Sequence, residues 1–158
     1  IQNLKALSKI DALETDLLVR EKLATASLFA GLAISQTRTA LCHSISYPLT
    51  LEFGLPHGLA CAFSMKSVLE YNMSSIKEDM RTISSRLEGQ DLIDVIDAVY
   101  SKYNIYEILR RYLPTKKSVM SLRKKMLTVG RADNNIVKVT DNDLIFILEQ
   151  SCELAQLT

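Results

Sequence analysis

The apolar residues of this chain recur with the period of an α-helix along most of its length. Between residues 16 and 35, Val19, Leu23, Ala26, Ala30 and Ala33 follow at spacings of four and three, so they share one helix face. The second half of this segment is rich in small side chains, which let a neighbouring helix approach closely. We therefore expect this helix to lie at the centre of the domain.

Helix-breaking residues are concentrated in one segment. Pro48, Gly54, Pro56 and Gly58 fall within eleven residues, whereas the whole chain has only five Gly and three Pro. We expect one helix over residues 37–47, another over residues 58–71, and a sharp reversal of the chain between them.

Regular amphipathic segments continue after residue 72. Gly89, Pro114 and Gly130 each stand where one of these segments is expected to stop. The last segment opens at Thr140, with acidic residues in its first turn, where the helix dipole favours negative charge. The pattern predicts an all-α fold, a single bundle of about seven helices. The expected helices of this half cover residues 76–87, 92–100, 105–112, 119–129 and 140–155.

Composition narrows the class of protein. The chain has 158 residues, is 47% hydrophobic and 23% charged, and carries a net charge of +1, which excludes a disordered tail and a collagen-like fibre. No apolar run reaches the roughly 18 residues that a membrane span needs, and the first eleven residues lack a signal-peptide layout. The three cysteines form no disulfide framework and no CxxC motif. These features indicate a cytoplasmic protein without a membrane partner.

The candidate chemistry lies beside the breaker-rich segment. His43 and His57 are the only histidines and flank this segment, so a reversal there would bring their side chains together. Two imidazoles on facing helices can share a divalent metal, but two unrelated histidines fit the spacing equally well. Two ligands are too few for a metal site, and Glu52, Cys42 and Cys61 are the neighbouring candidates. For both cysteines we favour a buried apolar role.

A second feature is a basic segment. Residues 108–132 contain eight basic residues and no acidic one. A phosphate or nucleic-acid surface is one interpretation, and a solvated face paired with acidic residues such as Asp91, Asp94 and Asp97 is the other. No nucleic-acid motif accompanies the segment, so we expect no nucleic-acid partner. The alternative function for the whole chain is a stand-alone helical interaction module that binds an acidic partner through residues 110–131.

Several motifs together resemble the C-terminal helical domain of the iron-containing (group III) alcohol dehydrogenases. They are Ala30-Gly31, the stretch TRTALCH ending at His43, Tyr47-Pro48-Leu49, and Pro56-His57-Gly58-Leu59-Ala60. The family has the same fourteen-residue interval between its two histidines. The resemblance continues more weakly to the segment NNIVKVTDNDLIFIL near the end of the chain.

The resemblance implies an NAD(P)-dependent oxidoreductase that interconverts a small primary alcohol and its aldehyde. His43 and His57 would be the third and fourth ligands of a catalytic divalent metal, with Fe²⁺ the first expectation and Zn²⁺ the second. The other two ligands, an Asp and a His, would precede Ile1, as would the nucleotide-binding domain that holds most of the NAD(H) or NADP(H). The chain would then be a C-terminal metal-site domain over residues 1–158, inactive alone and part of a homo-oligomeric protein.

One position departs from the family pattern. Many members carry a second His four residues after the first, suited to proton relay, and here that position is Tyr47. We take Tyr47 as the candidate catalytic residue. The sequence from Ser46 to Thr50 is more similar to that of the phosphonoacetaldehyde reductase-like branch, which acts on small anionic aldehydes, than to that of the ethanol or diol branch. An arginine such as Arg38 or Arg20 could then steer the anion.

Overall fold

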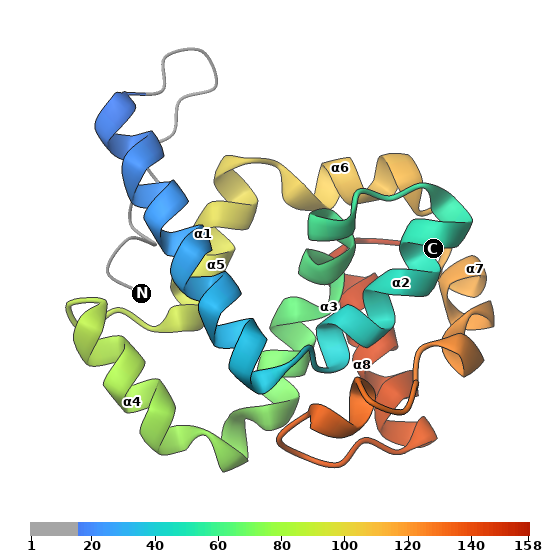
Figure 1. Ribbon diagram of the computed structural model, residues 1–158. Helices are drawn as coiled ribbons and strands as arrows, with labels where there is room; N and C mark the ends of the chain where they lie inside the picture. The colour runs from blue at the N-terminus through green and yellow to red at the C-terminus, as the bar shows by residue number, and fades with distance from the viewer. Residues whose placement is uncertain (1–15) are drawn as a thin grey trace. The chain divides into compact units, whose positions relative to one another are not determined.

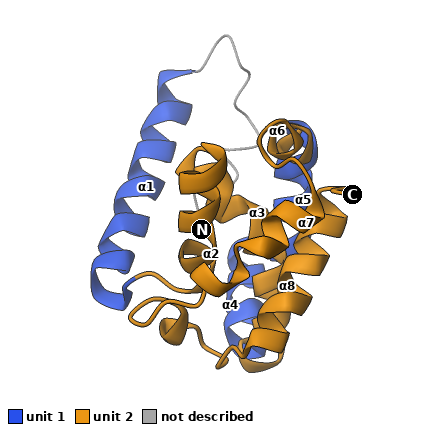
Figure 2. Ribbon diagram, turned by 90° about the vertical axis from the view of Figure 1, so that its right-hand side faces the viewer, with its two compact units in different colours: residues 1–38, 77–103 blue, residues 39–76, 104–158 orange. Residues whose placement is uncertain are grey.

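The computed structural model describes residues 16–158, and within that range all regular secondary structure is helical, with eight α-helices and no strand (Figure 1). The expected all-α class is confirmed. The N-terminal stretch that we judged unlike a signal peptide lies outside the described residues. The helices group into two compact units, one formed by residues 1–38 and 77–103 and the other by residues 39–76 and 104–158 (Figure 2).

The first unit contains three of the helices. The carboxylates of Asp16 and Asp91 cap two of them by accepting hydrogen bonds from Leu18 N–H (3.1 Å) and Ile93 N–H (2.8 Å). Such caps satisfy backbone donors that have no partner inside the helix. The helices are α1 (Leu17–Thr37), α4 (Lys77–Arg86) and α5 (Leu92–Lys102).

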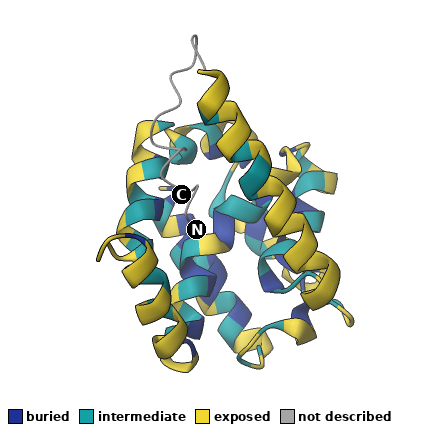
Figure 3. Cartoon of the chain, turned by 60° about the vertical axis from the view of Figure 1, so that its left-hand side comes forward, coloured by how far each residue is buried: buried dark blue, intermediate teal, exposed yellow. Residues whose placement is uncertain are grey.

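Helix α1 forms where the sequence predicts it, but the expectation that it lies at the centre of a domain is wrong. None of its residues is buried, and even its large apolar side chains, such as Leu28 and Phe29, are exposed (Figure 3). Small residues permit close helix packing but contribute little apolar area themselves, so they do not by themselves draw a helix into a core.

The second unit carries the main core and the candidate site. Helix α3 packs against both α2 and α8, and α7 also packs against α8. Leu41, Ile45 and Leu49 of α2 recur every four residues and are fully buried, so this face fixes the rotation of α2 about its axis. The unit comprises α2 (Leu41–Phe53), α3 (His57–Asn72), α6 (Ile105–Tyr112), α7 (Lys116–Ser121) and α8 (Asp141–Leu154), with the 3-10 turns η2 (Met73–Ser75), η3 (Arg123–Lys125) and η4 (Ala132–Asn134).

Helix α2 starts four residues later than expected and continues through Pro48 to Phe53. A proline inside a helix removes one backbone hydrogen bond and costs about 3 kcal/mol. Pro48 is itself buried, and the buried Leu49 follows it, so continued burial along α2 offsets that loss. The reversal of the chain is therefore confined to residues 54–56.

The expected helix over residues 119–129 is also shorter. Helix α7 ends at Ser121, and a 3-10 turn follows. The hydroxyl of Ser44 in α2 donates to the carbonyl of Met126, and its oxygen lies 3.0 Å from the hydroxyl of Thr128. These bonds replace helical ones, so Met126 stays buried while Val129, expected on the inner face, is 96% exposed.

Two amide side chains attach the loop before α8 to α3. Asn72 and Asn135 exchange hydrogen bonds of 3.0 and 2.8 Å, and Asn135 also donates to the carbonyl of Val137. Thr140 and Asp143 then form a capping box at the start of α8. Among the residues described, no helix is both long and apolar enough to cross a lipid bilayer.

Candidate metal centre

The turn between α2 and α3 brings the two histidines together. Gly54 ends α2 with φ +65°, the left-handed conformation that glycine adopts readily, and its N–H donates to the carbonyl of Thr50. Pro56 precedes α3, whose first residue is His57. The rings of His43 and His57 lie with centroids 5.4 Å apart and planes tilted by 57°. The turn thus creates the proximity that the sequence suggested, while ligation of a metal stays a prediction.

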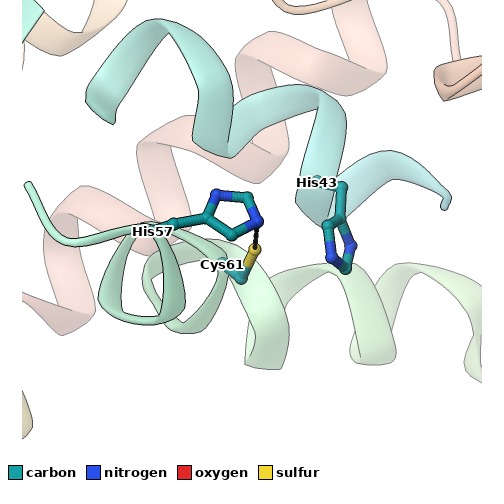
Figure 4. A group of neighbouring side chains, drawn as sticks. All are labelled: His43, His57 and Cys61. Carbon is teal, nitrogen blue, oxygen red and sulfur yellow. Dashed lines mark hydrogen bonds between the residues drawn. The ribbon is translucent and has the colours of Figure 1, made fainter. Parts of the chain in front are cut away.

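Cys61 joins the two histidines. It follows His57 by four residues on α3, and its Sγ lies 3.8 Å from Nε2 of His57 (Figure 4). One ligand atom from each of His43, His57 and Cys61 lies within 4.8 Å of the others. The sequence analysis favoured an apolar role for this cysteine, although its spacing of four from His57 already placed the two side chains on one helix face.

The other two candidates lie elsewhere. Cys42 is not part of the cluster, and desolvation raises the pKa of its thiol to about 11, so this half-buried side chain is neutral. Glu52 is exposed and lines a separate pocket with Lys125 and Arg131. Among the described residues, the cluster of potential ligands is therefore confined to His43, His57 and Cys61.

Ser46 determines which ring nitrogen of His57 carries the proton and which has a free lone pair. Its hydroxyl donates to the carbonyl of His43 (2.8 Å), and its oxygen lies 3.4 Å from Nδ1 of His57. A hydroxyl has one proton, so Ser46 can only accept a hydrogen bond from His57. This arrangement places the imidazole proton on Nδ1 and leaves the lone pair of Nε2 facing Cys61, the state that a metal ligand requires.

The surroundings favour neutral groups at this cluster. Burial lowers the pKa of His43, and the charge that His57 can carry lowers it further. Burial raises the pKa of the Cys61 thiol. A divalent metal would displace the thiol proton on binding, and the lowered pKa of His43 favours the neutral imidazole that a metal ligand requires.

Tyr47 borders the same cluster. Its ring centroid lies 5.4 Å from that of His57, with the planes tilted by 35°. The guanidinium carbon of Arg131 lies 4.1 Å from the centroid of the Tyr47 ring, within the range of a cation–π interaction. The candidate catalytic residue thus contacts both a candidate metal ligand and a cation.

The basic segment does not form one continuous surface element. It is divided among α6, α7, η3 and the loop that follows. Arg111 and Lys116 pair with Glu107 (2.7 Å) and Glu149 (3.4 Å), and Arg110 donates to the carbonyl of Ala155. The acidic partners of these ion pairs are residues other than the aspartates that the sequence suggested.

Comparison with known proteins identifies the family. The model described as Fe-containing alcohol dehydrogenase family, C-terminal, matches residues 3–152. Phosphonoacetaldehyde reductase of Streptomyces viridochromogenes is 41% identical over 68 residues, which cover 43% of this chain and 17% of that protein. The probable alcohol dehydrogenase EutG of Escherichia coli is 34% identical over 97 residues, which cover 60% of this chain and 25% of the relative. The 1,3-propanediol dehydrogenase of Citrobacter freundii is 32% identical over 88 residues, or 55% and 23% of the two chains.

The matched segments span at most a quarter of these three relatives. No solved structure matches the chain. The family match nevertheless covers nearly the whole sequence and includes both histidines, Tyr47 and Cys61. The chain matches the C-terminal region of this family over residues 3–152, and it therefore belongs to the iron-containing alcohol dehydrogenase family, a family of alcohol oxidoreductases.

Proposed function

We propose that this chain supplies the metal-site part of an NAD(P)-linked oxidoreductase that interconverts a small primary alcohol and its aldehyde. The observation that carries the proposal is the convergence of His43, His57 and Cys61 in a member of an alcohol dehydrogenase family. The relatives extend far beyond the segment matched here, so we assign the binding of most of the nicotinamide cofactor to residues outside this chain.

His43, His57 and Cys61 would hold the divalent metal, Fe²⁺ or Zn²⁺. Ligand atoms in a tetrahedral zinc site lie roughly 3.4 Å apart, as follows from Zn–N bonds of about 2.1 Å. The three side chains lie within 4.8 Å of one another, so small rotations bring them to that spacing. Two nitrogens and a sulfur form a ligand set that suits both metals and favours zinc. When bound, the metal supplies Lewis-acid polarisation of the substrate oxygen.

The neighbouring residues prepare the cluster for this role. Ser46 holds His57 in the tautomer with a free Nε2, and burial keeps His43 neutral. Tyr47 is the proposed catalytic residue because its side chain borders His57 and carries an exchangeable proton. Its hydroxyl would exchange that proton with the substrate oxygen as alcohol and aldehyde interconvert.

We include small anionic aldehydes of the phosphonoacetaldehyde type among the proposed substrates. The support is the 41% identity with phosphonoacetaldehyde reductase over a segment of 68 residues, together with the local sequence from Ser46 to Thr50. A catalytic metal that keeps an open position accepts a carbonyl or alcohol oxygen irrespective of the rest of the molecule. Groups further from the cluster therefore have to select the substrate.

The test replaces one ligand in the complete gene product that contains this chain. His57→Ala should remove bound metal, measured by elemental analysis, and should lower aldehyde reduction by at least about a hundredfold. Lys117→Ala is the control, because Lys117 is an exposed basic residue of α7, and it should leave both quantities unchanged. Full metal content and full turnover in His57→Ala would show that the proposal is wrong.

The same variants address the interaction-module alternative. Binding of an acidic partner through residues 110–131 would weaken steeply with salt, would respond to Lys117→Ala, and would be indifferent to His57. If such binding is observed and the complete gene product contains no metal, the interaction-module function replaces the oxidoreductase proposal.

A further inference from the structure

A pocket of about 230 Å³ lies beside the metal cluster, between α2 and the loop around η3. Ser44, Tyr47 and Pro48 line it from α2, and Lys125, Thr128 and Arg131 line it from the loop. We propose that this pocket binds the phosphonate or phosphate group of an anionic aldehyde substrate, with Arg131 and Lys125 as the residues that select it. The inference rests on the proposed function and deepens it by assigning the substrate class to particular side chains.

The charges in the pocket favour an anion. Arg131 is half-buried, and neither it nor Lys125 has a carboxylate partner within residues 16–158. Glu52 also lines the pocket but is exposed, so two cations face one anion and the pocket keeps a net positive charge. Arginine is well suited to a tetrahedral oxyanion because its planar guanidinium can donate two parallel hydrogen bonds.

Tyr47 fixes the orientation of Arg131. The guanidinium carbon lies 4.1 Å from the centroid of the Tyr47 ring, so the ring holds the cation by a cation–π interaction, which does not use the N–H donors of the guanidinium. This stacking explains how an arginine stays half-buried without a carboxylate beside it. The substitution of Tyr for the family's second His is thus coupled to the position of the cation.

The loop that carries both cations is held in place. Ser44 donates to the carbonyl of Met126, and the N–H of Thr128 donates to the Ser44 oxygen (3.4 Å). The N–H groups of Arg131 and Ala132 in turn donate to the carbonyl of Thr128 at 3.2 and 3.0 Å. A site held this way loses little conformational freedom when it binds a ligand.

The pocket and the metal cluster share Tyr47. The centroid of its ring lies 5.4 Å from the centroid of the His57 ring and 4.1 Å from the guanidinium carbon of Arg131. In the proposed binding mode, the carbonyl oxygen of a short substrate lies at the histidine cluster and its oxyanion at Arg131, on either side of their shared neighbour Tyr47. Such a molecule would be preferred over a neutral aldehyde, which leaves the cations unpaired.

The binding test uses the metal-free chain and phosphonoacetate, an unreactive anion, observed by ¹H–¹⁵N NMR with circular dichroism to check folding. We expect phosphonoacetate to shift the resonances of Lys125, Thr128 and Arg131 at physiological salt, whereas neutral acetamide leaves them unchanged. Arg131→Gln should weaken phosphonoacetate binding about tenfold. Arg131→Lys should weaken it less, because the positive charge remains although the two parallel N–H donors of the guanidinium are lost.

Matched controls lie next to the pocket in the sequence. Arg123→Gln and Lys124→Gln remove exposed cations that do not line the pocket, so affinity should stay within about twofold of the wild type. Lys125→Gln should weaken binding in the same direction as Arg131→Gln. Equal affinity in folded Arg131→Gln and Arg123→Gln, or equal shifts with acetamide, would overturn the inference.

This test is independent of metal and nicotinamide. If Arg131 is needed for phosphonoacetate binding but His57→Ala keeps metal and turnover in the complete gene product, the proposed function fails and the anion pocket stands. If His57→Ala abolishes both and Arg131 is not needed for binding, the anion inference fails and the proposed function stands.

Discussion

Cys61 lies one helical turn after His57 on α3, and the sulfur of the first faces Nε2 of the second at 3.8 Å. This pair predicts that the chain binds metal through sulfur as well as nitrogen. In a Co²⁺ titration of the isolated chain, Cys61→Ser should lower the affinity at least about tenfold and should abolish the thiolate-to-cobalt charge-transfer absorption. Cys42→Ser is the matched control, because Cys42 is also a free cysteine but lies outside the cluster. A charge-transfer band retained in Cys61→Ser would rule out the sulfur ligand.

A second prediction concerns the proton on His57. Ser46→Ala removes the acceptor for Nδ1–H, so the fraction of His57 with a free Nε2 should fall, and metal affinity should drop about tenfold or more. Imidazole ¹⁵N chemical shifts measure the tautomer directly. Ser121→Ala is the control, because the Ser121 hydroxyl also donates to a carbonyl three residues earlier but is exposed and far in sequence from the histidines. An unchanged His57 tautomer in Ser46→Ala would contradict the assignment.

The capping box of α8 predicts how stability depends on pH. Hydrogen bonds from the Thr140 hydroxyl and backbone N–H lower the pKa of the Asp143 carboxyl below its ordinary value of 3.8. The unfolded chain therefore binds that proton more readily, and Asp143 stabilises the fold above pH 3.8 and loses its effect as the pH falls through the lowered value. Asp143→Asn should be less stable than the wild type near neutral pH, and the difference should shrink in acid.

Urea denaturation at a series of pH values checks this expectation. Asp141→Asn is the matched control, since Asp141 lies in the same first turn but outside the capping box. A stability difference for Asp143→Asn that stays constant from neutral pH to well below pH 3.8 would show that the capping carboxylate is not responsible.

The amide pair between α3 and the loop before α8 predicts a loss of stability on truncation. Asn135→Ala leaves the buried amide of Asn72 without the two hydrogen bonds it shares with Asn135, and should cost about 2 kcal/mol in free energy of unfolding. Asn142→Ala, an exposed position on α8, should change it by less than about 0.5 kcal/mol. If the two variants lose the same free energy of unfolding, the Asn72–Asn135 pair contributes little to stability.

The sequence predicted the parts of the fold that depend on local signals. The helices expected over residues 92–100 and 105–112 are observed at Leu92–Lys102 and Ile105–Tyr112, and they follow from apolar periodicity and from the helix-breaking Pro114. The proximity of His43 and His57 followed from the concentration of Gly and Pro between them. These signals act within a few residues of the positions they control, so a single sequence is enough to interpret them.

The parts that failed depend on contacts distant in the chain. Pro48 stays inside α2 because tertiary burial outweighs its local preference, and α7 stops early because Ser44, more than eighty residues away, takes up the carbonyl of Met126. Arg131 lies over the Tyr47 ring, a contact that the sequence did not predict, while anion steering by Arg38 or Arg20 stays a prediction. The Sγ of Cys61 lies 3.8 Å from Nε2 of His57, and the role of Cys61 as a ligand stays a prediction.

The connection between α2 and α3 has a consequence for insertions and deletions. It consists of only residues 54–56, and the helix that follows begins with His57 itself. Removing one residue there would draw the first turn of α3 into the connection. His57 would then leave the helix, and its imidazole would lose its position beside His43. The length of this loop, more than the identity of its side chains, is therefore what a viable variant must preserve.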